Sequence, residues 1–246
     1  MGGLPRGYQA TFLEAVGSTN DVAKTAAGDG AVDATVFWTT HQTAGRGTHG
    51  RDWATPPGNL AVSIVKRPRI PIGFASQGAL VTAVALAEAL IALGLAEARV
   101  RLKWPNDVLV DGAKIAGILL EGEADGPATR WLVIGTGLNL VHHPAQTRHP
   151  ATNLAALGLE TAPQAAFAAY LTAFDRWWSR WRRYDFQVIA TAWAARTYHK
   201  PGDFLTVTHG RQTLQVAYRG LAPDGALVVQ GVDGLEKRIV SGEVFV

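Results

Sequence analysis

Apolar and polar positions recur along the chain with spacings that predict helices and strands in a mixed order. Ser18 to Asp21 precede an Ala-rich run that stops at Gly28, which is typical of a capped helix. Between residues 163 and 184, apolar residues recur every three or four positions, which predicts an amphipathic helix. The pattern also predicts one long, mostly buried helix and several strands: the helix at 73–95, and strands at 35–40, 60–65, 100–103, 108–110, 113–121 and 131–134.

The pattern changes after Pro201, where short β-type runs are separated by turn signals. These signals are the dipeptides His209-Gly210, Asp224-Gly225 and Asp233-Gly234. Roughly 45 residues with this pattern predict a small all-β barrel. We therefore expect a larger domain at residues 1–200 and a β domain at residues 201–246.

The composition is that of a folded protein and argues against several classes. The chain has 246 residues, of which 48% are hydrophobic and 17% charged, so it can bury a sizeable core. A net charge of +3 is too small to imply a nucleic-acid partner, and the absence of Cys excludes disulfides and thiolate metal sites. The N-terminus lacks a signal-peptide core, and Thr82 and Glu88 interrupt the longest apolar run, so we expect a cytoplasmic protein without a membrane span.

The Gly-rich segment 45–50 fits two nucleotide-binding patterns and completes neither. It reads G-x-G-x-x-G, but a strand follows it and no acidic residue lies between Asp52 and Glu88, so a dinucleotide fingerprint fails. Arg51 and Asp52 stand where a phosphate-binding loop needs Lys and Ser or Thr. A mobile anion cradle flanked by Arg46 and Arg51 remains, with a plain hairpin tip as the alternative.

A second motif places a carboxylate beside a lysine. A two-residue turn at Asp111-Gly112 pairs Leu109 with Lys114, so Asp107 and Lys114 become diagonal neighbours about 7 Å apart on one face. The pair could be a surface ion pair. Because apolar residues surround Lys114, its burial would be costly unless an anion relieved it. A carboxylate that can hold Mg²⁺ beside a lysine that can bridge a carboxylate and a phosphate suggests activation of a carboxylic acid by ATP.

With these motifs in place, the sequence resembles the biotin–protein ligase family. The resemblance covers nearly the whole chain and rests on motifs in the family's order and spacing: STND, QTAGRG-xx-GR-x-W followed by Pro-Gly-Asn-Leu, KWPNDVLV, K-x-AG-IL-x-E and GTGLN. It implies an α+β fold of the class II synthetase-like, biotin–lipoate ligase type. In that fold a mixed β-sheet is flanked by helices, and a small SH3-like barrel follows at the C-terminus.

The resemblance implies a reaction in two steps. Biotin and MgATP give biotinoyl-AMP and pyrophosphate, and a lysine of a biotin carboxyl carrier domain of a carboxylase then attacks the mixed anhydride to form an amide. Biotin, ATP and Mg²⁺ would be required, without a tightly bound cofactor. Only 17 residues precede Ser18, so we expect no N-terminal helix-turn-helix domain and no DNA partner. A homodimer is left open.

The resemblance also implies roles for individual residues. Lys114 and Arg46 would be catalytic, gripping the biotin carboxylate and the α-phosphate as pyrophosphate leaves. Asp107 would bind or orient Mg²⁺. The biotin-binding residues would be Ser18, Thr19, Asn20, Gln42, Gly45, Arg46, Gly47, Thr48, Lys114 and Gly117. The ATP-binding residues would be Arg46, Arg51, Asn106, Asp107, Lys114 and Asn139.

Two further segments are expected near the ligands. Trp53 is expected to pack beside the Gly-rich loop rather than to stack on adenine. The segment 142–153 is expected to close over adenine, without a metal, because its histidines lack regular ligand spacing.

Three other functions compete with this interpretation. A lipoate–protein ligase shares the fold and the acyl-adenylate chemistry, but KWPND, QTAGRG and the barrel favour biotin. A non-catalytic biotin or nucleotide sensor is suggested by Thr48, which stands where the family commonly has Arg. Nucleic-acid binding through RWWSRWRRYDF is disfavoured, because its tryptophans continue the apolar stripe of the 163–184 helix.

A small basic patch could assist the reaction from outside the site. Lys66, Arg67 and Arg69 lie in an interval that has no acidic residue from Trp53 to Ala87. Such a patch could steer an acidic carrier domain, although a solvated strand end explains it equally well.

The Thr48 departure generates a prediction. Arg at this position would add up to two charge-assisted contacts to the bound adenylate. We expect Thr48→Arg to slow the release of biotinoyl-AMP, measured as adenylate dissociation from the purified protein. An unchanged release rate would show that Thr48 does not weaken retention, or that His49 already replaces the missing guanidinium.

Overall fold

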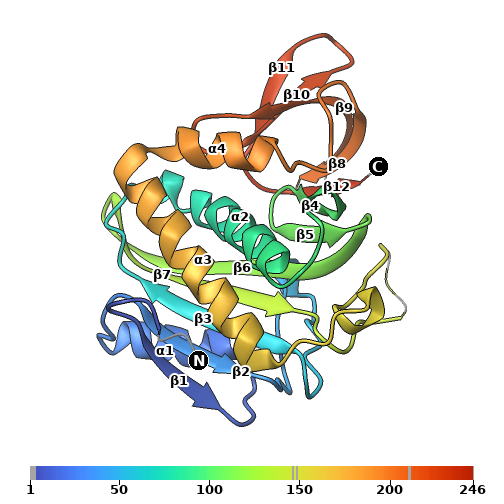
Figure 1. Ribbon diagram of the computed structural model, residues 1–246. Helices are drawn as coiled ribbons and strands as arrows, with labels where there is room; N and C mark the ends of the chain where they lie inside the picture. The colour runs from blue at the N-terminus through green and yellow to red at the C-terminus, as the bar shows by residue number, and fades with distance from the viewer. Residues whose placement is uncertain (1–3, 146, 148, 210–211, 246) are drawn as a thin grey trace.

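A seven-stranded mixed sheet forms the centre of the larger domain in the computed structural model, which describes residues 4–145, 147, 149–209 and 212–245 (Figure 1). The strand order is β1-β2-β3-β7-β6-β5-β4, with β1 and β2 parallel and every other neighbouring pair antiparallel. The strands are β1 (Gln9–Leu13), β2 (Thr35–Thr39), β3 (Leu60–Lys66), β4 (Val100–Lys103), β5 (Asp107–Val110), β6 (Ala113–Asp125) and β7 (Ala128–Leu138). The predicted mixed sheet is confirmed.

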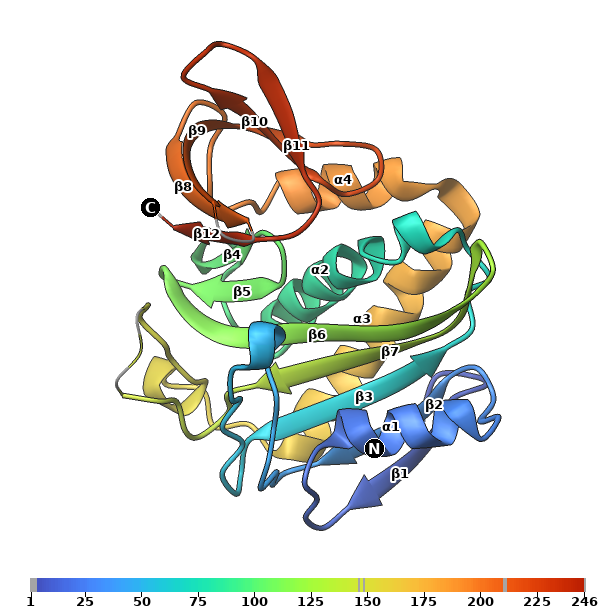
Figure 2. The same cartoon turned by 180° about the vertical axis from the view of Figure 1, so that it is seen from behind.

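Helices cover both faces of this sheet. Helices α2 (Gln77–Ala92) and α3 (Pro163–Tyr184) pack side by side on one face, and α1 (Thr19–Gly28) lies on the opposite face (Figures 1 and 2). Helix α4 (Phe186–Ala194) leads towards the second domain. Short 3-10 turns complete the set: η1 (Thr48–Gly50), η2 (Ile72–Phe74), η3 (Glu97–Arg99) and η4 (Ala155–Leu157).

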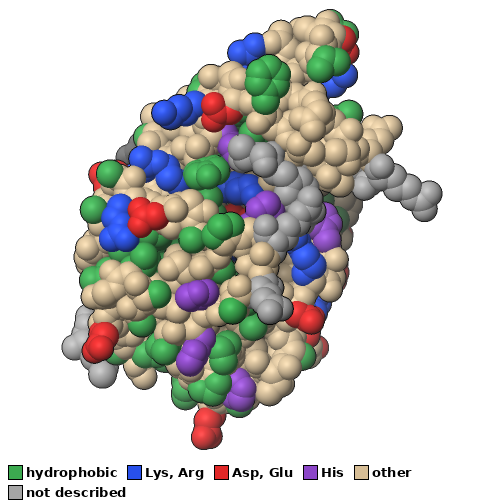
Figure 3. Space-filling view, turned by 90° about the vertical axis from the view of Figure 1, so that its right-hand side faces the viewer, with side chains coloured by type: hydrophobic (Ala, Val, Ile, Leu, Met, Phe, Trp, Pro, Cys, Tyr) green, Lys and Arg blue, Asp and Glu red, His purple; other side chains and the backbone are tan. Residues whose placement is uncertain are grey.

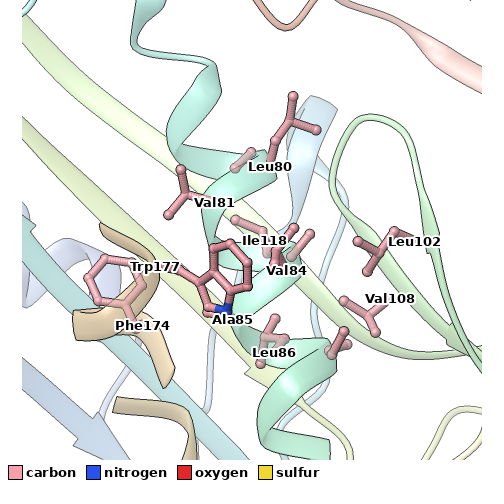
Figure 4. Close-up of a cluster of buried hydrophobic side chains, with 14 of the residues drawn as sticks. Leu80, Val81, Val84, Ala85, Leu86, Leu102, Val108, Ile118, Phe174 and Trp177 are labelled. Atoms are coloured by element: carbon pink, nitrogen blue, oxygen red, sulfur yellow. The ribbon is translucent and has the colours of Figure 1, made fainter. Parts of the chain in front are cut away.

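The core forms between the sheet and helices α2 and α3. Figure 4 shows Leu80 and Val84 of α2 beside Ile118 of β6, with Trp177 of α3 in the same cluster. Helix α2 is buried almost all round, so its sequence shows little amphipathic pattern. It begins at Gln77 rather than near Gly73, because residues 72–74 form a separate 3-10 turn, so the predicted start was four residues early.

The position of helix α3 argues against the alternative that the RWWSRWRRYDF segment binds nucleic acid. It spans the predicted residues, and Trp177, Trp178 and Trp181 are all buried in the core. Tryptophans in the core cannot offer faces on which bases stack. The RWWSRWRR segment is therefore a packing element with a charged outer side.

The basic patch predicted near the end of β3 is partly structural. The ammonium of Lys66 is buried and paired with Asp33, so it is not a solvated charge. The guanidinium of Arg67 donates to the carbonyls of Ala27 and Ala31 at 2.7 and 2.8 Å, where it caps the C-terminal end of α1. Of the three, Arg69 alone is exposed, so the patch offers little free charge to a carrier domain.

The C-terminal domain is a five-stranded antiparallel sheet in the order β11-β10-β9-β8-β12, curled beside β4 and α4 (Figure 1). Its strands are β8 (Phe204–His209), β9 (Gln212–Leu221), β10 (Leu227–Gly231), β11 (Glu236–Ile239) and β12 (Glu243–Phe245). The predicted small all-β unit is confirmed, although Gly210 of one predicted turn lies outside the described residues. The boundary at residue 200 falls in the connection between α4 and β8 and stays a prediction.

Hydrogen bonds between described residues attach this domain to the larger one. Trp104 Nε1 donates to the carbonyl of Gly225 at 3.1 Å, and Gln77 Nε2 donates to the carbonyl of Pro223 at 3.0 Å. Within the described residues, one helical segment, Ile72–Ala92, is long and apolar enough to span a bilayer, but 72% of its apolar window is buried inside the fold. That segment therefore belongs to the core.

Candidate active site

A cavity of about 480 Å³ lies on the α1 side of the sheet and collects the residues that the sequence singled out. Its floor is the centre of the sheet, and its walls are the start of α1, the Gly-rich loop, the β5–β6 hairpin and part of the segment 144–151. Figure 2 looks onto this side, where the turn η1 stands in front of β6. The predicted site residues that line the cavity are Ser18, Thr19, Asn20, Gln42, Arg46, Gly47, Thr48, Arg51, Asn106, Asp107, Lys114, Gly117 and Asn139.

One end of the cavity is a neutral polar network at the start of α1. Thr19 donates from its backbone N–H and its hydroxyl to Gln42 Oε1, at 2.8 and 3.1 Å. Gln42 Nε2 in turn donates to Thr55 Oγ1 at 3.0 Å. Ser18 occupies the predicted N-cap position, but its side chain makes no capping hydrogen bond. Its hydroxyl therefore belongs to the cavity lining rather than to the helix end.

Ser63 of β3 is a member of this network that the sequence did not single out. Its hydroxyl lies 2.6 Å from Asn20 Oδ1 and 2.8 Å from Thr19 Oγ1, and it is fully buried. A Cβ on Gly135 would lie 2.2 Å from Asn20 Oδ1, so glycine is required for the Asn20 side chain to lie on the sheet. The one available signal was a polar Ser in the apolar strand LAVSIV.

The Gly-rich loop is a closed hairpin. The Trp53 N–H donates to the Gly45 carbonyl at 2.9 Å, and the Gly47 N–H donates to the Arg51 carbonyl at 2.7 Å. A Cβ on Gly45 would lie 2.3 Å from the Trp53 carbonyl oxygen, so this close backbone approach requires glycine. Arg51 donates to the hydroxyl of Thr48 at 3.1 Å. The segment is therefore a hairpin tip, and its residues Arg46, Gly47, Thr48 and Arg51 also line the cavity.

Trp53 lies inside the cavity, on a floor made by two paired glycines. Gly117 of β6 is directly opposite Gly137 of β7, and an added Cβ on either would lie within 3.0 Å of the Trp53 ring. The Lys114 ammonium lies 5.3 Å from the centre of the same ring. Trp53 is thus a packing residue in this structure, and a ligand resting on Gly117 would have to displace its ring or pack against it.

Arg46 is held by two carboxylates on the α1 side of the cavity. Its guanidinium donates to Glu121 at 2.9 and 3.3 Å and to Asp21 at 2.6 Å. Glu121 also accepts from Lys24 Nζ at 2.8 Å and from Asn20 Nδ2 at 2.9 Å. Arg46 therefore lines the predicted cavity, but its donors are committed to carboxylates of the protein.

Glu121 is the second functional residue that the sequence left without a role. Burial alone would raise its pKa, but hydrogen bonds from Lys24, Asn20 and Arg46 outweigh burial and hold the pKa below its usual range. The hydrogen bond to Glu121 raises the pKa of Lys24. Glu121 lies on β6, so its ion pairs with Arg46 and Lys24 link the Gly-rich loop and helix α1 to the sheet.

Lys114 and Asp107 form the ion pair that the hairpin pattern indicated. Asp111 and Gly112 both have positive φ, and the turn pairs Leu109 with Lys114 as expected. A bulge not predicted from the sequence then shifts the register, so that Asp107 is opposite Gly117. Lys114 Nζ lies 2.5 Å from Asp107 Oδ1, and both side chains are about three-quarters buried. Both residues of the pair line the cavity.

Asn106 and Asn139 have mainly structural partners. Asn106 Nδ2 donates to the Ile118 carbonyl at 2.8 Å and fixes the start of β5 against β6. Asn139 is buried, and its Nδ2 donates to the Thr152 carbonyl at 3.0 Å. Both residues line the cavity, so a contact with nucleotide would use the side-chain atoms that take no part in these hydrogen bonds.

The carboxylates of the site suit a metal ion that binds together with a nucleotide, and among the described residues they do not form a site for a metal held by the protein alone. The described residues contain no group of three or more His, Asp or Glu side chains suited to holding an ion. Asp107 is a single carboxylate at the cavity floor, which suits a Mg²⁺ that keeps waters and phosphates as its other ligands. The donor set therefore fits MgATP.

The Glu121 network generates a prediction about pH. Because the pKa of Glu121 is lower in the folded chain than in the unfolded chain, its contribution to stability is present above the unfolded pKa of about 4.3 and is lost as pH falls through the folded pKa. We expect Glu121→Gln to lower the urea midpoint at pH 7, and its deficit against wild type to shrink below about pH 4.

The matched control is Glu123→Gln on the same strand. Glu123 pairs with Arg130 on the exposed surface, where an ion pair contributes little. Urea titrations of both variants between pH 3 and pH 7 provide the measurement. A deficit for Glu121→Gln that is independent of pH would show that shape, and not charge, carries the contribution of this residue.

Comparison with known proteins shows which family the chain belongs to. Residues 14–139 match the biotin/lipoate A/B protein ligase family, and residues 206–246 match the biotin protein ligase C-terminal domain. A biotin–[acetyl-CoA-carboxylase] ligase of Paracoccus denitrificans is 36% identical over 83% of this chain and 87% of its own length. A bifunctional ligase/repressor of Bacillus subtilis is 28% identical over 97% of this chain and 74% of its own length.

A solved structure shows the same fold. A biotin protein ligase from Aquifex aeolicus in complex with biotin and ATP has a TM-score of 0.80 at 23% identity, covering 96% of this chain and 97% of that chain. The fold implied by the sequence resemblance, a mixed sheet with a small C-terminal β domain, is thereby confirmed. The chain belongs to the biotin/lipoate A/B protein ligase family.

Proposed function

We propose that this chain is a biotin–[biotin carboxyl-carrier protein] ligase, which activates biotin with ATP and transfers it to a lysine of a carrier domain. The proposal rests on one observation: a single cavity has two chemically different ends. A neutral network of Thr19, Asn20 and Gln42 lies at one end, and the Lys114–Asp107 pair lies at the other. A neutral polar head group and an anionic reaction centre in one ligand would match both ends.

The neutral end suits the ureido group of biotin. This group has N–H donors and a carbonyl acceptor but no charge, so it needs partners of both kinds. The amides of Asn20 and Gln42 and the hydroxyls of Ser18 and Thr19 provide both kinds. Burial of the network makes an unmatched ligand costly, because its polar atoms would remain unpaired.

The charged end suits the adenylation step. A biotin carboxylate oxygen attacks the α-phosphorus of ATP, and the bond to the β-phosphate oxygen breaks as pyrophosphate leaves. Lys114 would neutralise charge on the carboxylate and the phosphate, and Arg46 would add its charge after leaving Glu121 and Asp21. Mg²⁺ bound with the nucleotide would supply further charge neutralisation, with Asp107 as a protein ligand.

The transfer step depends on holding the adenylate in place for the carrier lysine, and it uses no nucleophile of the ligase itself. The amine of a carrier lysine attacks the acyl carbon of the adenylate, AMP leaves with the bonding electron pair, and the amine loses a proton as the amide forms. The cavity holds the acyl-phosphate at the Lys114 end, where the hairpin loop can exclude water.

The relatives support biotin over lipoate and an enzyme over a sensor. The 36% identical relative is a biotin ligase acting on acetyl-CoA carboxylase, and the C-terminal domain matches the biotin protein ligase type. The carrier domain of a carboxylase is accordingly the proposed partner. A cytoplasmic location completes the proposal, and the oligomeric state, for which a homodimer stays open, is tested by the mass of the native protein in solution.

One reaction tests the proposed function. Purified protein is incubated with MgATP, a biotin carboxyl carrier domain and either biotin or lipoate, and the carrier is measured by mass. We expect the mass of one biotinoyl group on a single lysine and no lipoyl product. Binding of biotin without transfer would favour the sensor, and lipoyl transfer would favour the lipoate ligase.

Lys114 provides a second test of the mechanism. We expect Lys114→Ala to lower the rate of biotin-dependent pyrophosphate release roughly 100-fold or more, because a donor aimed at the developing charge is lost. Lys114→Arg keeps the charge but changes its geometry, and should fall between wild type and Lys114→Ala. Lys200→Ala, on an exposed loop, is the control and should match wild type. A Lys114→Ala enzyme with full activity would remove this residue from the mechanism.

A further inference from the structure

Asn59 is a buried side chain that the proposed mechanism does not use. It follows Gly58 at the point where β3 begins, and only 2% of its surface is exposed. The pairing of β3 with β7 ends beside it, at Leu60 and Leu138. Beyond this point the two strands separate, and the chain after β7 leaves the sheet.

The Asn59 amide continues the hydrogen bonding where the strands stop. Its Oδ1 accepts from the N–H groups of Leu140, Val141 and His142, at 3.1, 3.0 and 3.0 Å. Its Nδ2 donates to the carbonyl of His142 at 2.9 Å. Three successive N–H groups that converge on one oxygen resemble the backbone nests that hold anions, but here a side chain of the protein fills the nest.

The backbone that Asn59 holds is the beginning of a longer segment. This segment forms the wall of the cavity at its proposed nucleotide end. Pro144, His149, Pro150 and Ala151 of this segment line the cavity near Lys114 and Asn139. Residues 146 and 148 lie outside the described part. Figure 3 faces the side of the molecule on which the segment lies, and several histidine side chains gather on that surface.

The far end of the segment is fixed to the active-site hairpin. The Lys114 N–H donates to the Pro150 carbonyl at 2.8 Å, and the Thr152 N–H donates to the Lys114 carbonyl at 2.9 Å. Asn139 Nδ2 adds a bond to the Thr152 carbonyl. The segment is therefore tied at one end to Lys114 and at the other end to Asn59.

Asn59 also lies on the chain that carries the Gly-rich loop. Its N–H donates to the Pro56 carbonyl at 3.2 Å, which closes the turn that follows Trp53 and Thr55. Gly58 has a φ of +98°, and a Cβ there would lie 3.3 Å from Val141 Cγ2, so the turn packs directly on the held segment. The turn 56–59 thus joins the loop over the biotin end to the wall of the nucleotide end.

We propose that Asn59 is a positioning residue for nucleotide binding, which sets the described residues of the wall, 140–145, 147 and 149–152, against MgATP and joins them to the Gly-rich loop. The inference rests on the proposed function. Asn59 touches neither reacting group, and it acts through the backbone at residues 140–142. Asp could accept the same three N–H groups, but it would place an oxygen against the His142 carbonyl, so the amide is required for the full set of bonds.

The test separates nucleotide binding from general stability. Pyrophosphate exchange is measured against MgATP at saturating biotin and against biotin at saturating MgATP, for wild type, Asn59→Ala and Asn59→Asp. We expect the KM for MgATP to rise roughly tenfold in Asn59→Ala, while the KM for biotin stays within about twofold. Asn59→Asp should show a smaller rise, because it keeps the three accepted bonds.

Gln77→Ala is the matched control. Gln77 is a buried amide with two hydrogen bonds, to Trp181 and to the carbonyl of Pro223, and it lies outside the cavity. Its loss should lower the melting temperature without changing either KM. Equal rises in both KM values for Asn59→Ala, or an unchanged KM for MgATP, would overturn the inference. If Asn59→Ala does not fold, Asn59→Asp is judged by the same criterion.

A failure of the proposed function is recognised separately. It appears as a wild-type chain that shows no biotin-dependent exchange at all. The inference about Asn59 is then decided by the rise in melting temperature that MgATP causes. A smaller rise in the Asn59 variants than in wild type and Gln77→Ala supports the inference, and equal rises overturn it.

Discussion

Two of the cations that line the cavity, Lys114 and Arg46, are each neutralised by carboxylates of the chain itself. Lys114 is paired with Asp107 on the β5–β6 hairpin, and Arg46 is paired with Glu121 of β6 and Asp21 of α1. An unpaired cation that is mostly buried would be strongly unfavourable, so the carboxylates keep the cavity stable. An incoming anion then competes with a carboxylate instead of meeting a bare charge.

The rest of the cavity follows from how closely side chains can approach the sheet. Gly117, Gly135 and Gly137 leave the middle of β6 and β7 without side chains on the α1 face. Asn20 and Trp53 lie in the space that these glycines leave. The opposite face of the same strands packs against α2, so the sheet separates the cavity from the core by the thickness of one backbone layer.

Much of this structure could be predicted from local sequence, since local patterns determine local structure. The Asp111-Gly112 turn, the α3 stripe and the motifs that line the cavity were all legible in this way. The start of α2 was misplaced because a helix buried all round has no polar face to mark its end. The residue roles expected from the resemblance stay predictions, although the structure brings most of those residues to one cavity.

The residues that sequence reasoning missed act across long separations in the chain. Glu121 contacts Arg46 and Asn20 from 75 and 101 positions away, and Asn59 holds the backbone 81 to 83 positions further on. Ser63 was visible only as a polar residue in an apolar strand. No local period or turn signal encodes such pairings, because they depend on which strands become neighbours. The bulge that sets Asp107 opposite Gly117 was invisible for the same reason.

The bond from the Trp104 indole to Gly225 has a consequence for the architecture. Trp104 stands three residues before Asp107, so the loop that leads to this carboxylate packs on the turn between β9 and β10. Gly242 and Val244 from the same small sheet also reach the cavity. The small C-terminal sheet therefore contributes wall residues to a cavity that is otherwise built by the larger domain, so the two domains share one binding surface.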